Sequence, residues 1–375
     1  MHLIDTHCHL LNFKFIPDKF LKTRVPFEES VLRKKWAWGL AWIFANLPFV
    51  KAKRLHEYLA LFNQDIFGVA EDMDAEMTAA NIDLAIPLMM DLATASFGQK
   101  PETPYRLQIH YMSRIALKYP GRIMPFVMLD PRRPGSGQMV IKALDKLGFL
   151  GVKMYPPLGY HPDPDSIINP PAVNDELQEV YKYCEDNCVP ITTHCSPGGA
   201  YGSDIYRDIE SLPQYTHPSN WVGVLNKYPE LYLNLSHGGG RWLHDNSWWP
   251  DVLNLIRTFP HVFADVAYHD GALENNTQAK YFEMLSGILA TSGVQDRILF
   301  ATDWPMIRHR WRMQDFVAPF VARLMKSQLQ QIAFDNPINF LFCGGKMPKR
   351  IQAFYEADAE AKANVPDWLK AKLHY

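Results

Sequence analysis

The sequence begins with two histidines separated by one residue, in the segment I-D-T-H-C-H. Side chains alternate along a strand, so His7 and His9 are expected to project on the same side, close together. Two imidazoles placed in this way suit a first-row divalent cation. An HxH pair alone is weak evidence, because packed or surface histidines are common.

Side chains that bind metals or transfer protons recur at four later points, where an apolar run stops and a Gly- or Pro-rich loop begins. They are Lys153 in G-V-K-M-Y, His194 in I-T-T-H-C, His237 in L-N-L-S-H-G-G-G and Asp303 in F-A-T-D-W-P. The fourteen histidines of the chain would produce one or two such coincidences. The recurrence therefore predicts one shared site rather than isolated histidines.

The elements that must position these residues alternate between short apolar segments and longer amphipathic ones, which is typical of βα units around a parallel sheet. Eight strands are expected, at Leu3–Asp5, Leu84–Met89, Ile123–Met128, Gly151–Met154, Pro190–Thr193, Leu231–Leu235, Val262–Val266 and Ile298–Ala301. Helices are expected between them, for example Tyr105–Tyr119, Gly137–Leu147, Asn174–Asn187, Ser219–Tyr228, Trp249–Phe259 and Thr277–Ser292. No phosphate-binding glycine loop follows the first strand. This pattern predicts a single α/β domain, a (β/α)₈ TIM barrel, whose strand ends converge on one rim.

The motif set resembles the amidohydrolase superfamily. I-D-T-H-C-H, G-V-K-M-Y-P-P, T-D-W-P and the D-N-P-I-N-F-L-F segment around Asn336 are most similar to the branch that includes aminocarboxymuconate-semialdehyde-decarboxylase-like enzymes. The resemblance extends from Met1 to about Phe342, apart from an insertion. It is specific for the superfamily and says little about the substrate.

The resemblance implies that His7, His9, His194 and Asp303 bind one divalent cation, zinc or alternatively manganese. A catalytic cation leaves one position open for water and lowers its pKa to about 7. Asp303 would then accept the proton of the attacking water. His237 would polarise a substrate carbonyl or shuttle a proton, as a catalytic residue rather than a ligand.

Lys153 has two functional interpretations and one structural alternative. Carbamylated by CO₂, it would bridge two ions, and His237 would then bind the second one. Unmodified, it would be a cation that binds an anionic group of the substrate. A lysine that extends along the surface to reach water is the third option, less suited to a strand end. One ion is favoured, because in the related decarboxylases the sixth-strand histidine is not a ligand.

Neighbours of these residues are candidates for substrate binding. Arg241 suits a carboxylate, although a surface salt bridge would explain it equally well. Tyr155 and Trp304 would line the pocket, although aromatic residues at a barrel rim often serve packing. For His269 and Asp270 a loop hydrogen bond is the simpler explanation. Cys8 and Cys195 should point away from the metal, because side chains alternate.

The first βα connection is unusually long, at residues 11–71, and it is rich in Trp, Phe and Lys. We interpret it as an insertion that forms a lid or a subunit contact in a homodimer. Its apolar stretch, Trp36–Val50, has fifteen residues, fewer than the roughly twenty needed to span a bilayer. The tail after Cys343 is expected to wrap the outside or to join a subunit contact.

The composition of the chain limits the classes of molecule that it is expected to bind. The 375 residues are 47% hydrophobic and 21% charged, and the formal net charge is −2. A net charge this small does not attract nucleic acid electrostatically, so a small-molecule substrate is expected. Met1 leads directly into the first strand, and the five cysteines show no secreted spacing. Free thiols in the cytoplasm are therefore expected.

Three functions remain open. The first is hydrolysis of an amide, ester or lactone bond through a metal-activated water, which Lys153 favours. The second is non-oxidative decarboxylation of an aromatic or unsaturated carboxylic acid, which Arg241 and the aromatic insertion favour. The third is a metal-binding barrel without catalysis, which acts as an interaction module. The intact set of ligands and catalytic residues argues against the third.

Overall fold

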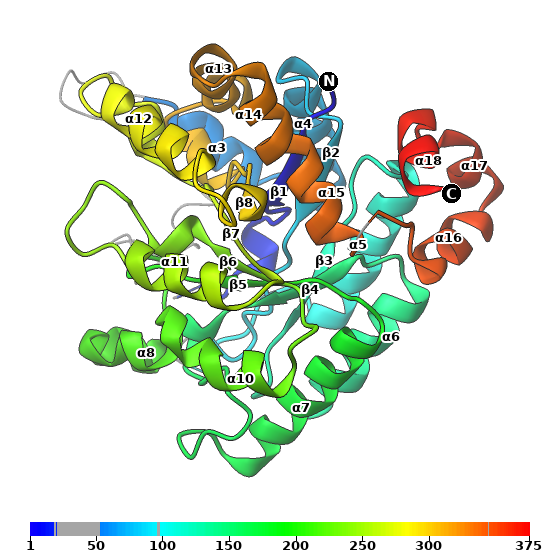
Figure 1. Cartoon of the computed structure of the whole chain (residues 1–375). Helices are drawn as coiled ribbons and strands as arrows, with labels where there is room; N and C mark the ends of the chain where they lie inside the picture. Colours follow the sequence, from blue (N-terminus) through cyan, green and yellow to red (C-terminus); the bar gives the residue numbers. More distant parts are fainter. Residues whose placement is uncertain (19, 21–52, 96–97, 344) are drawn as a thin grey trace.

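The computed structural model describes residues 1–18, 20, 53–95, 98–343 and 345–375. Eight short parallel strands occur in this part of the chain, and they lie at the centre of the molecule (Figure 1). They are β1 (Ile4–Cys8), β2 (Leu84–Pro87), β3 (Phe126–Leu129), β4 (Gly151–Met154), β5 (Ile191–His194), β6 (Leu233–Ser236), β7 (Val262–Asp265) and β8 (Ile298–Leu299). Each overlaps a strand expected from the sequence.

Backbone hydrogen bonds join the strands in sequence order around a barrel. Regular pairing links β1 to β2 and links β3 through to β8. Between β2 and β3, the amide of Met89 donates to the carbonyl of Phe126 at 3.0 Å. Between β1 and the end of β8, the amide of Thr6 donates to Phe300 at 3.2 Å. The predicted (β/α)₈ architecture is confirmed.

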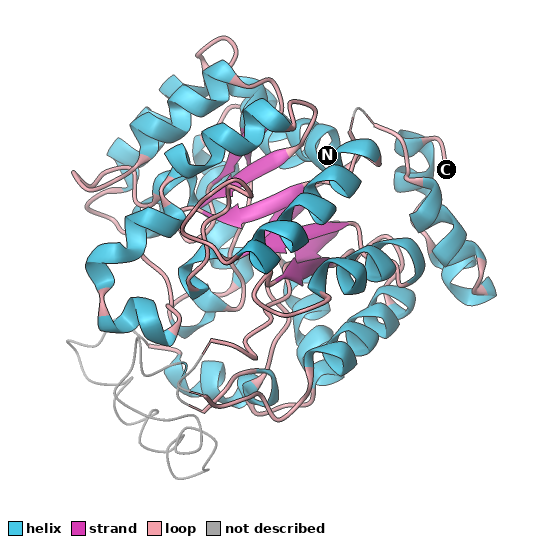
Figure 2. Cartoon of the chain, turned by 90° about the horizontal axis from the view of Figure 1, so that it is seen from below, coloured by secondary structure: helices cyan, strands magenta, loops and turns pink. Residues whose placement is uncertain are grey.

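Helices enclose the strands (Figure 2). Those that follow successive strands include α4 (Ile66–Ala79), α5 (Tyr105–Lys118), α6 (Ser136–Lys146), α7 (Pro171–Asp186), α10 (Val222–Lys227), α11 (Trp249–Thr258), α12 (Gln278–Leu289), α13 (Met313–Arg323), α14 (Lys326–Gln330) and α15 (Asn336–Leu341). In α7, Val173, Leu177, Val180 and Cys184 are buried at helical spacing, which is the apolar stripe a barrel helix needs. The helix expected at Ser219–Tyr228 is instead a 3₁₀ turn, η5 (Pro218–Trp221), followed by α10.

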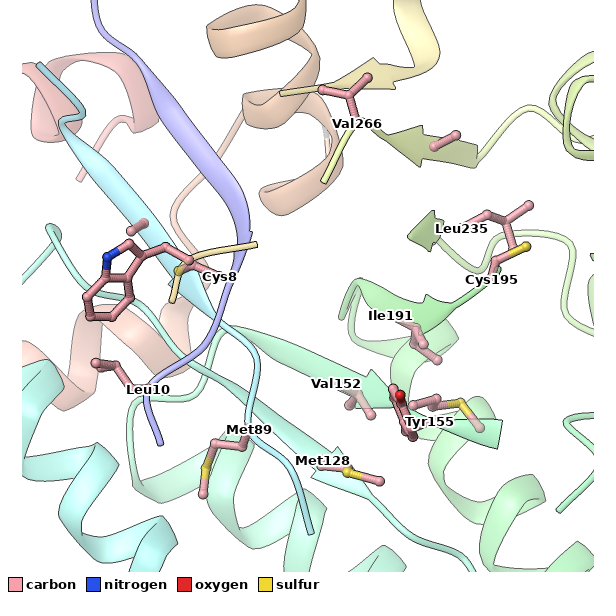
Figure 3. Close-up of a cluster of buried hydrophobic side chains, with 14 of the residues drawn as sticks. Cys8, Leu10, Met89, Met128, Val152, Tyr155, Ile191, Cys195, Leu235 and Val266 are labelled. Atoms are coloured by element: carbon pink, nitrogen blue, oxygen red, sulfur yellow. The ribbon is translucent and has the colours of Figure 1, made fainter. Parts of the chain in front are cut away.

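Strand alternation sorts side chains between the packed core and the site. Val152, Ile191 and Leu235 come from three neighbouring strands and lie in one cluster of buried side chains (Figure 3). Cys8 and Cys195 belong to the same cluster, as expected from alternation. Residues on either side of these positions therefore face the barrel interior and its rim.

Part of the long β1–β2 connection is described. It includes η1 (Phe13–Phe15) and α3 (Leu55–Phe62), and the barrel helix α4 begins at Ile66. The amide of Arg54 donates to the carbonyl of His309 at 2.9 Å, so α3 starts beside the loop that follows β8. Trp36–Val50 lies outside the described residues, and its interpretation as a lid or subunit contact stays a prediction.

The tail forms α16 (Lys349–Glu356), α17 (Ala359–Asn364) and α18 (Asp367–Leu373). Tyr355 and Leu369 are buried in a second cluster together with Ile4 and Leu84, the first residues of β1 and β2. The tail therefore packs against the amino ends of these strands, opposite the rim that carries the site. Within the described residues, no helix has the length and apolar character that crossing a membrane requires.

Candidate metal centre and active site

Three of the predicted ligands form a compact group at the carboxyl ends of β1 and β8. The Nε2 atoms of His7 and His9 are 3.3 Å apart. Oδ1 of Asp303 lies 3.3 Å from Nε2 of His9 and 3.7 Å from Nε2 of His7. All three side chains are buried or nearly so. They form a group of donor atoms that could hold a metal ion.

The hydrogen-bond partners determine which ring nitrogens carry protons. Nδ1 of His9 lies 2.7 Å from the carbonyl oxygen of Leu88, which only accepts, so this nitrogen is protonated and donates. Nδ1 of His7 lies 3.1 Å from the carboxylate of Asp265 and donates likewise. When both rings are neutral, their Nε2 atoms therefore present lone pairs toward Oδ1 of Asp303. Three lone pairs this close repel one another unless a cation lies among them, so these residues fit a divalent metal.

The electrostatics of the group agree with metal binding. Burial lowers the pKa of His7 to about 4, although Asp265 acts in the opposite direction. The ring is therefore neutral near pH 7, as a ligand must be. Burial alone would raise the pKa of Asp303, but His9 and His7 in their protonated forms, through a hydrogen bond from His9 and through their positive charges, hold it below its usual value. Asp303 is thus an anion with a buried oxygen, Oδ1, that has no hydrogen-bond partner among the described residues.

His194, the fourth predicted ligand, lies beside this group with its Nε2 turned elsewhere. Its ring centroid is 4.9 Å from that of His237 and 4.8 Å from that of Tyr155. Its Nε2 lies 2.7 Å from the carbonyl oxygen of Gly198. The structure therefore brings His194 to the site but not within the donor group that His7, His9 and Asp303 form.

His237 and Lys153 complete the set of predicted catalytic residues. The His237 ring is 4.9 Å from that of His7, and its Nδ1 lies 3.0 Å from the carbonyl of Ala267, which leaves Nε2 as the free nitrogen. Lys153 is fully buried, and its Nζ has no hydrogen-bond partner in the described part of the chain. Burial lowers the pKa of Lys153 to about 8, against the attraction of Asp265 and Asp303.

Asp265, at the end of β7, is a site residue that the sequence reasoning missed. Its Oδ2 accepts from Nδ1 of His7 at 3.1 Å and from Nδ2 of Asn234 at 2.7 Å. Its Oδ1 accepts from the amides of His237 at 2.8 Å and Ala267 at 3.1 Å. The signal that could have found it was the segment V-F-A-D, which ends a strand in an acid as F-A-T-D does.

The predicted substrate-binding residues have different surroundings. Arg241 is half exposed, and its guanidinium lies 2.9 Å from Oδ2 of Asp270. The Tyr155 hydroxyl donates to the carbonyl of Ala200 at 2.9 Å, next to His194. Trp304 is wholly buried in the main hydrophobic cluster, a position that favours the packing interpretation.

His269 makes the loop hydrogen bonds that were the simpler expectation for it. Its Nε2 lies 2.9 Å from the carbonyl of His237, and its Nδ1 lies 3.0 Å from the hydroxyl of Tyr281. The ring is buried. It therefore links the backbone of His237 to helix α12.

An amidohydrolase family model matches residues 4–342, which is most of the sequence. The chain belongs to the amidohydrolase family. Membership agrees with the site described above and indicates a metal-dependent enzyme of the amidohydrolase type. A comparison with curated proteins finds no match.

Solved structures with a similar fold include members with different chemistry. One is a 5-carboxyvanillate decarboxylase from Novosphingobium aromaticivorans in complex with manganese, with 16% identity and a TM-score of 0.59 over 91% of this chain and 96% of that one. Another is a 2,6-dihydroxybenzoate decarboxylase, with 15% identity and a TM-score of 0.55 over 91% and 99%. A third, from Acinetobacter baumannii, is described as a probable 2-pyrone-4,6-dicarboxylic acid hydrolase, with 14% identity and a TM-score of 0.52 over 91% and 100%. At these identities the likeness establishes the fold of this amidohydrolase and not its reaction.

Proposed function

We propose that this amidohydrolase is a hydrolase that cleaves an amide, ester or lactone bond of a small molecule through a metal-activated water. The observation that carries the proposal is the convergence of His7 Nε2, His9 Nε2 and Asp303 Oδ1 within 3.3–3.7 Å. These atoms would hold the ion, zinc in the first instance and manganese as the alternative. His194 would join them once its Nε2 leaves the carbonyl of Gly198.

A divalent cation bound there supplies Lewis acidity and lowers the pKa of water to about 7. The chain supplies the remaining chemistry. Asp303 is an anion whose Oδ1 belongs to the donor group, which leaves its Oδ2 to accept the proton that the attacking water releases. His237 is held through Nδ1 by Ala267, which leaves its Nε2 to exchange a proton with the leaving group.

Lys153 favours hydrolysis over decarboxylation. Its Nζ is buried beside the site and has no hydrogen-bond acceptor among the described residues, so it is available to a substrate oxygen. An acyl-transfer reaction develops negative charge on such an oxygen, and a buried donor stabilises that charge strongly. The second candidate is decarboxylation of an aromatic or unsaturated carboxylic acid. Two structural neighbours are decarboxylases, and the half-exposed Arg241 could bind a carboxylate.

The test is a screen of zinc- or manganese-loaded protein against lactones, N-acyl compounds and hydroxybenzoates. Each reaction is followed both for acid release and for CO₂. Hydrolysis predicts acid release without CO₂, and CO₂ from a hydroxybenzoate would overturn it in favour of the second candidate. Asp303→Asn should abolish the activity, whereas His244→Gln at an exposed position should leave it unchanged and serves as the matched control. Protein that binds metal but turns over no compound of any class would support the interaction module instead.

A further inference from the structure

Two cysteines far apart in the sequence lie together on the side of the barrel that faces the tail. Sγ of Cys343 is 3.1 Å from the carbonyl oxygen of Cys188, across 155 residues of chain. Cys188 is exposed and Cys343 is partly buried, whereas the other three cysteines are buried. The pair is thus the one place among the chain's cysteines where a thiol contacts the backbone of a second cysteine that is accessible.

Each cysteine is the second residue after the end of a helix, Cys188 after α7 and Cys343 after α15. After α7, the amide of Val189 donates to the carbonyl of Cys184 at 2.8 Å, and that of Cys188 donates to Glu185 at 3.4 Å. This is the Schellman arrangement, in which the residue at the position of Cys188 is usually glycine because its backbone is left-handed. Cys188 has φ 50° there, and Cys343, beyond α15, has φ 39°.

Left-handed backbone is unfavourable for a residue with a Cβ atom. Glycine has no Cβ atom and would avoid this conformational cost at both helix ends. A cysteine occupies each of the two positions instead. Helix capping therefore does not by itself explain these two cysteines.

The two thiols differ in exposure and in electrostatic environment, and the difference in exposure sets the order in which they meet an oxidant. Burial raises the pKa of Cys343 well above its usual value, and the neighbouring Cys188 thiol raises it further. The guanidinium of Arg350 acts in the opposite direction. It is fixed beside them by hydrogen bonds to the carbonyls of Leu150 at 2.5 Å and Leu144 at 3.3 Å. Cys188 is exposed and so meets an oxidant first, and Cys343 is then its resolving partner.

We propose that Cys188 and Cys343 are a site of reversible oxidation that forms a disulfide with a peroxide as the oxidant. The sulfur of Cys188 attacks one peroxide oxygen, so an S–O bond forms, the O–O bond breaks and one water leaves. The sulfur of Cys343 then attacks the sulfenic sulfur, the S–O bond breaks, and its oxygen leaves with the Cys343 proton as a second water. Two thiols lose two electrons, and one hydrogen peroxide becomes two waters.

The disulfide would fix the point where the tail begins. Cys343 precedes the three helices whose residues Tyr355 and Leu369 pack against the amino ends of the strands. Closing a loop of 155 residues restricts the unfolded chain and should raise the Tm by several degrees. The metal centre is at the opposite rim, so turnover should not change, and the site stands independently of the proposed function.

The experiment exposes the full-length protein to hydrogen peroxide near stoichiometry and then alkylates free thiols. Non-reducing peptide mass spectrometry should find the Cys188 and Cys343 peptides joined, and a thiol reductant should separate them. Cys343→Ser should instead leave Cys188 as a sulfenic acid that a dimedone probe captures. Cys184→Ser is the matched control, since its thiol lies one helical turn from Cys188, and it should leave the cross-link intact.

Other results of the same experiment would overturn the proposal. A Cys184–Cys188 cross-link would overturn the proposal, as would Cys188 that overoxidises or resists oxidation while Cys343 is present. If Cys343→Ser or Cys188→Ser folds poorly, alkylation of the wild-type protein decides the matter. Loss of both thiols together on titration with oxidant supports the pair, and independent loss contradicts it.

Discussion

Nδ1 of His7 lies 3.1 Å from Oδ2 of Asp265, so a buried carboxylate at the end of β7 orients the first histidine of the candidate metal centre. The same carboxylate accepts the backbone amide of His237 through its other oxygen, at 2.8 Å. One side chain therefore orients the ring of a proposed ligand and also fixes the backbone position of the proposed acid–base histidine. Carboxylates that hold a metal-bound histidine in this way commonly tune metal affinity.

Asp265→Asn should lower metal affinity by about 10- to 100-fold. The four groups around the carboxylate all donate, so the amide NH₂ of asparagine must face donors on one side. Competition with a chromophoric chelator measures the affinity, and thermal unfolding checks the fold. Asp130→Asn is the control, because Asp130 is equally buried but pairs with Arg132. Equal losses of affinity in both variants would mean that Asp265 acts only through general stability.

The stability of the protein should fall in mild acid partly because of His269. Burial lowers its pKa to about 4, while the pKa in the unfolded chain is about 6.5. The unfolded state therefore binds more protons between these values, so the stability His269 contributes is complete above pH 6.5 and is lost as pH falls toward 4. Between pH 7 and pH 5 the free energy of unfolding that His269 contributes falls by about 2 kcal/mol.

His269→Gln should make the free energy of unfolding less sensitive to pH, by about 2 kcal/mol between pH 7 and pH 5. Urea unfolding of metal-free protein at both pH values measures this difference. His244→Gln, at an exposed position, should behave as the parent. An unchanged pH dependence in His269→Gln would show that His7 or another buried group causes the acid sensitivity.

The positions of the strands could be predicted from the sequence. Short apolar runs between amphipathic segments have few structural interpretations other than buried strands in a protein of this composition. Once the strands close into a barrel, their carboxyl ends share one rim, which explains why His7, His9 and Asp303 meet across about 300 residues. Alternation also predicts which side of a strand a residue faces. It correctly places Cys8 and Cys195 in the core.

Local geometry was harder to predict, because it depends on partners from other strands. Alternation places His194 on the site's side but cannot say that its Nε2 contacts Gly198. Asp265 was missed because its role appears only when β1 and β7 are brought together. For Trp304 the sequence left both pocket lining and packing open, and its buried ring in the core favours packing. The two cysteines at helix ends could not be paired without the fold.

The aromatic insertion provides a third prediction. The described residues that follow it place α3 beside the loop that follows β8, near the rim that carries the site. Replacing residues 21–52 by a short Gly/Ser linker should therefore raise KM or change the oligomeric state, while metal content stays the same. Steady-state kinetics, light scattering and metal analysis test this. Unchanged kinetics and assembly would show that the segment is neither a lid nor a subunit contact.

The two interpretations of Lys153 differ in charge, and metal analysis separates them. A carbamylated Lys153 is an anion that could hold a second ion roughly 3.5–4 Å from the first, with His237 as a ligand. An unmodified Lys153 is a cation or a neutral amine, which offers no carboxylate bridge. Its Nζ lacks a hydrogen-bond acceptor in the described structure, as we expect of an amine that donates a hydrogen bond to a substrate oxygen.

We expect about one equivalent of metal per chain in the native enzyme, as one group of ligands would hold. Lys153→Met keeps the length of the side chain and removes its nitrogen, so it should retain that equivalent while kcat/KM falls about 10-fold or more. In the binuclear case the native enzyme would hold about two equivalents, and Lys153→Ala would lose one. Short carboxylates such as formate would then restore the second ion. Two equivalents in the native enzyme would move His237 into the ligand set and exclude the mononuclear mechanism.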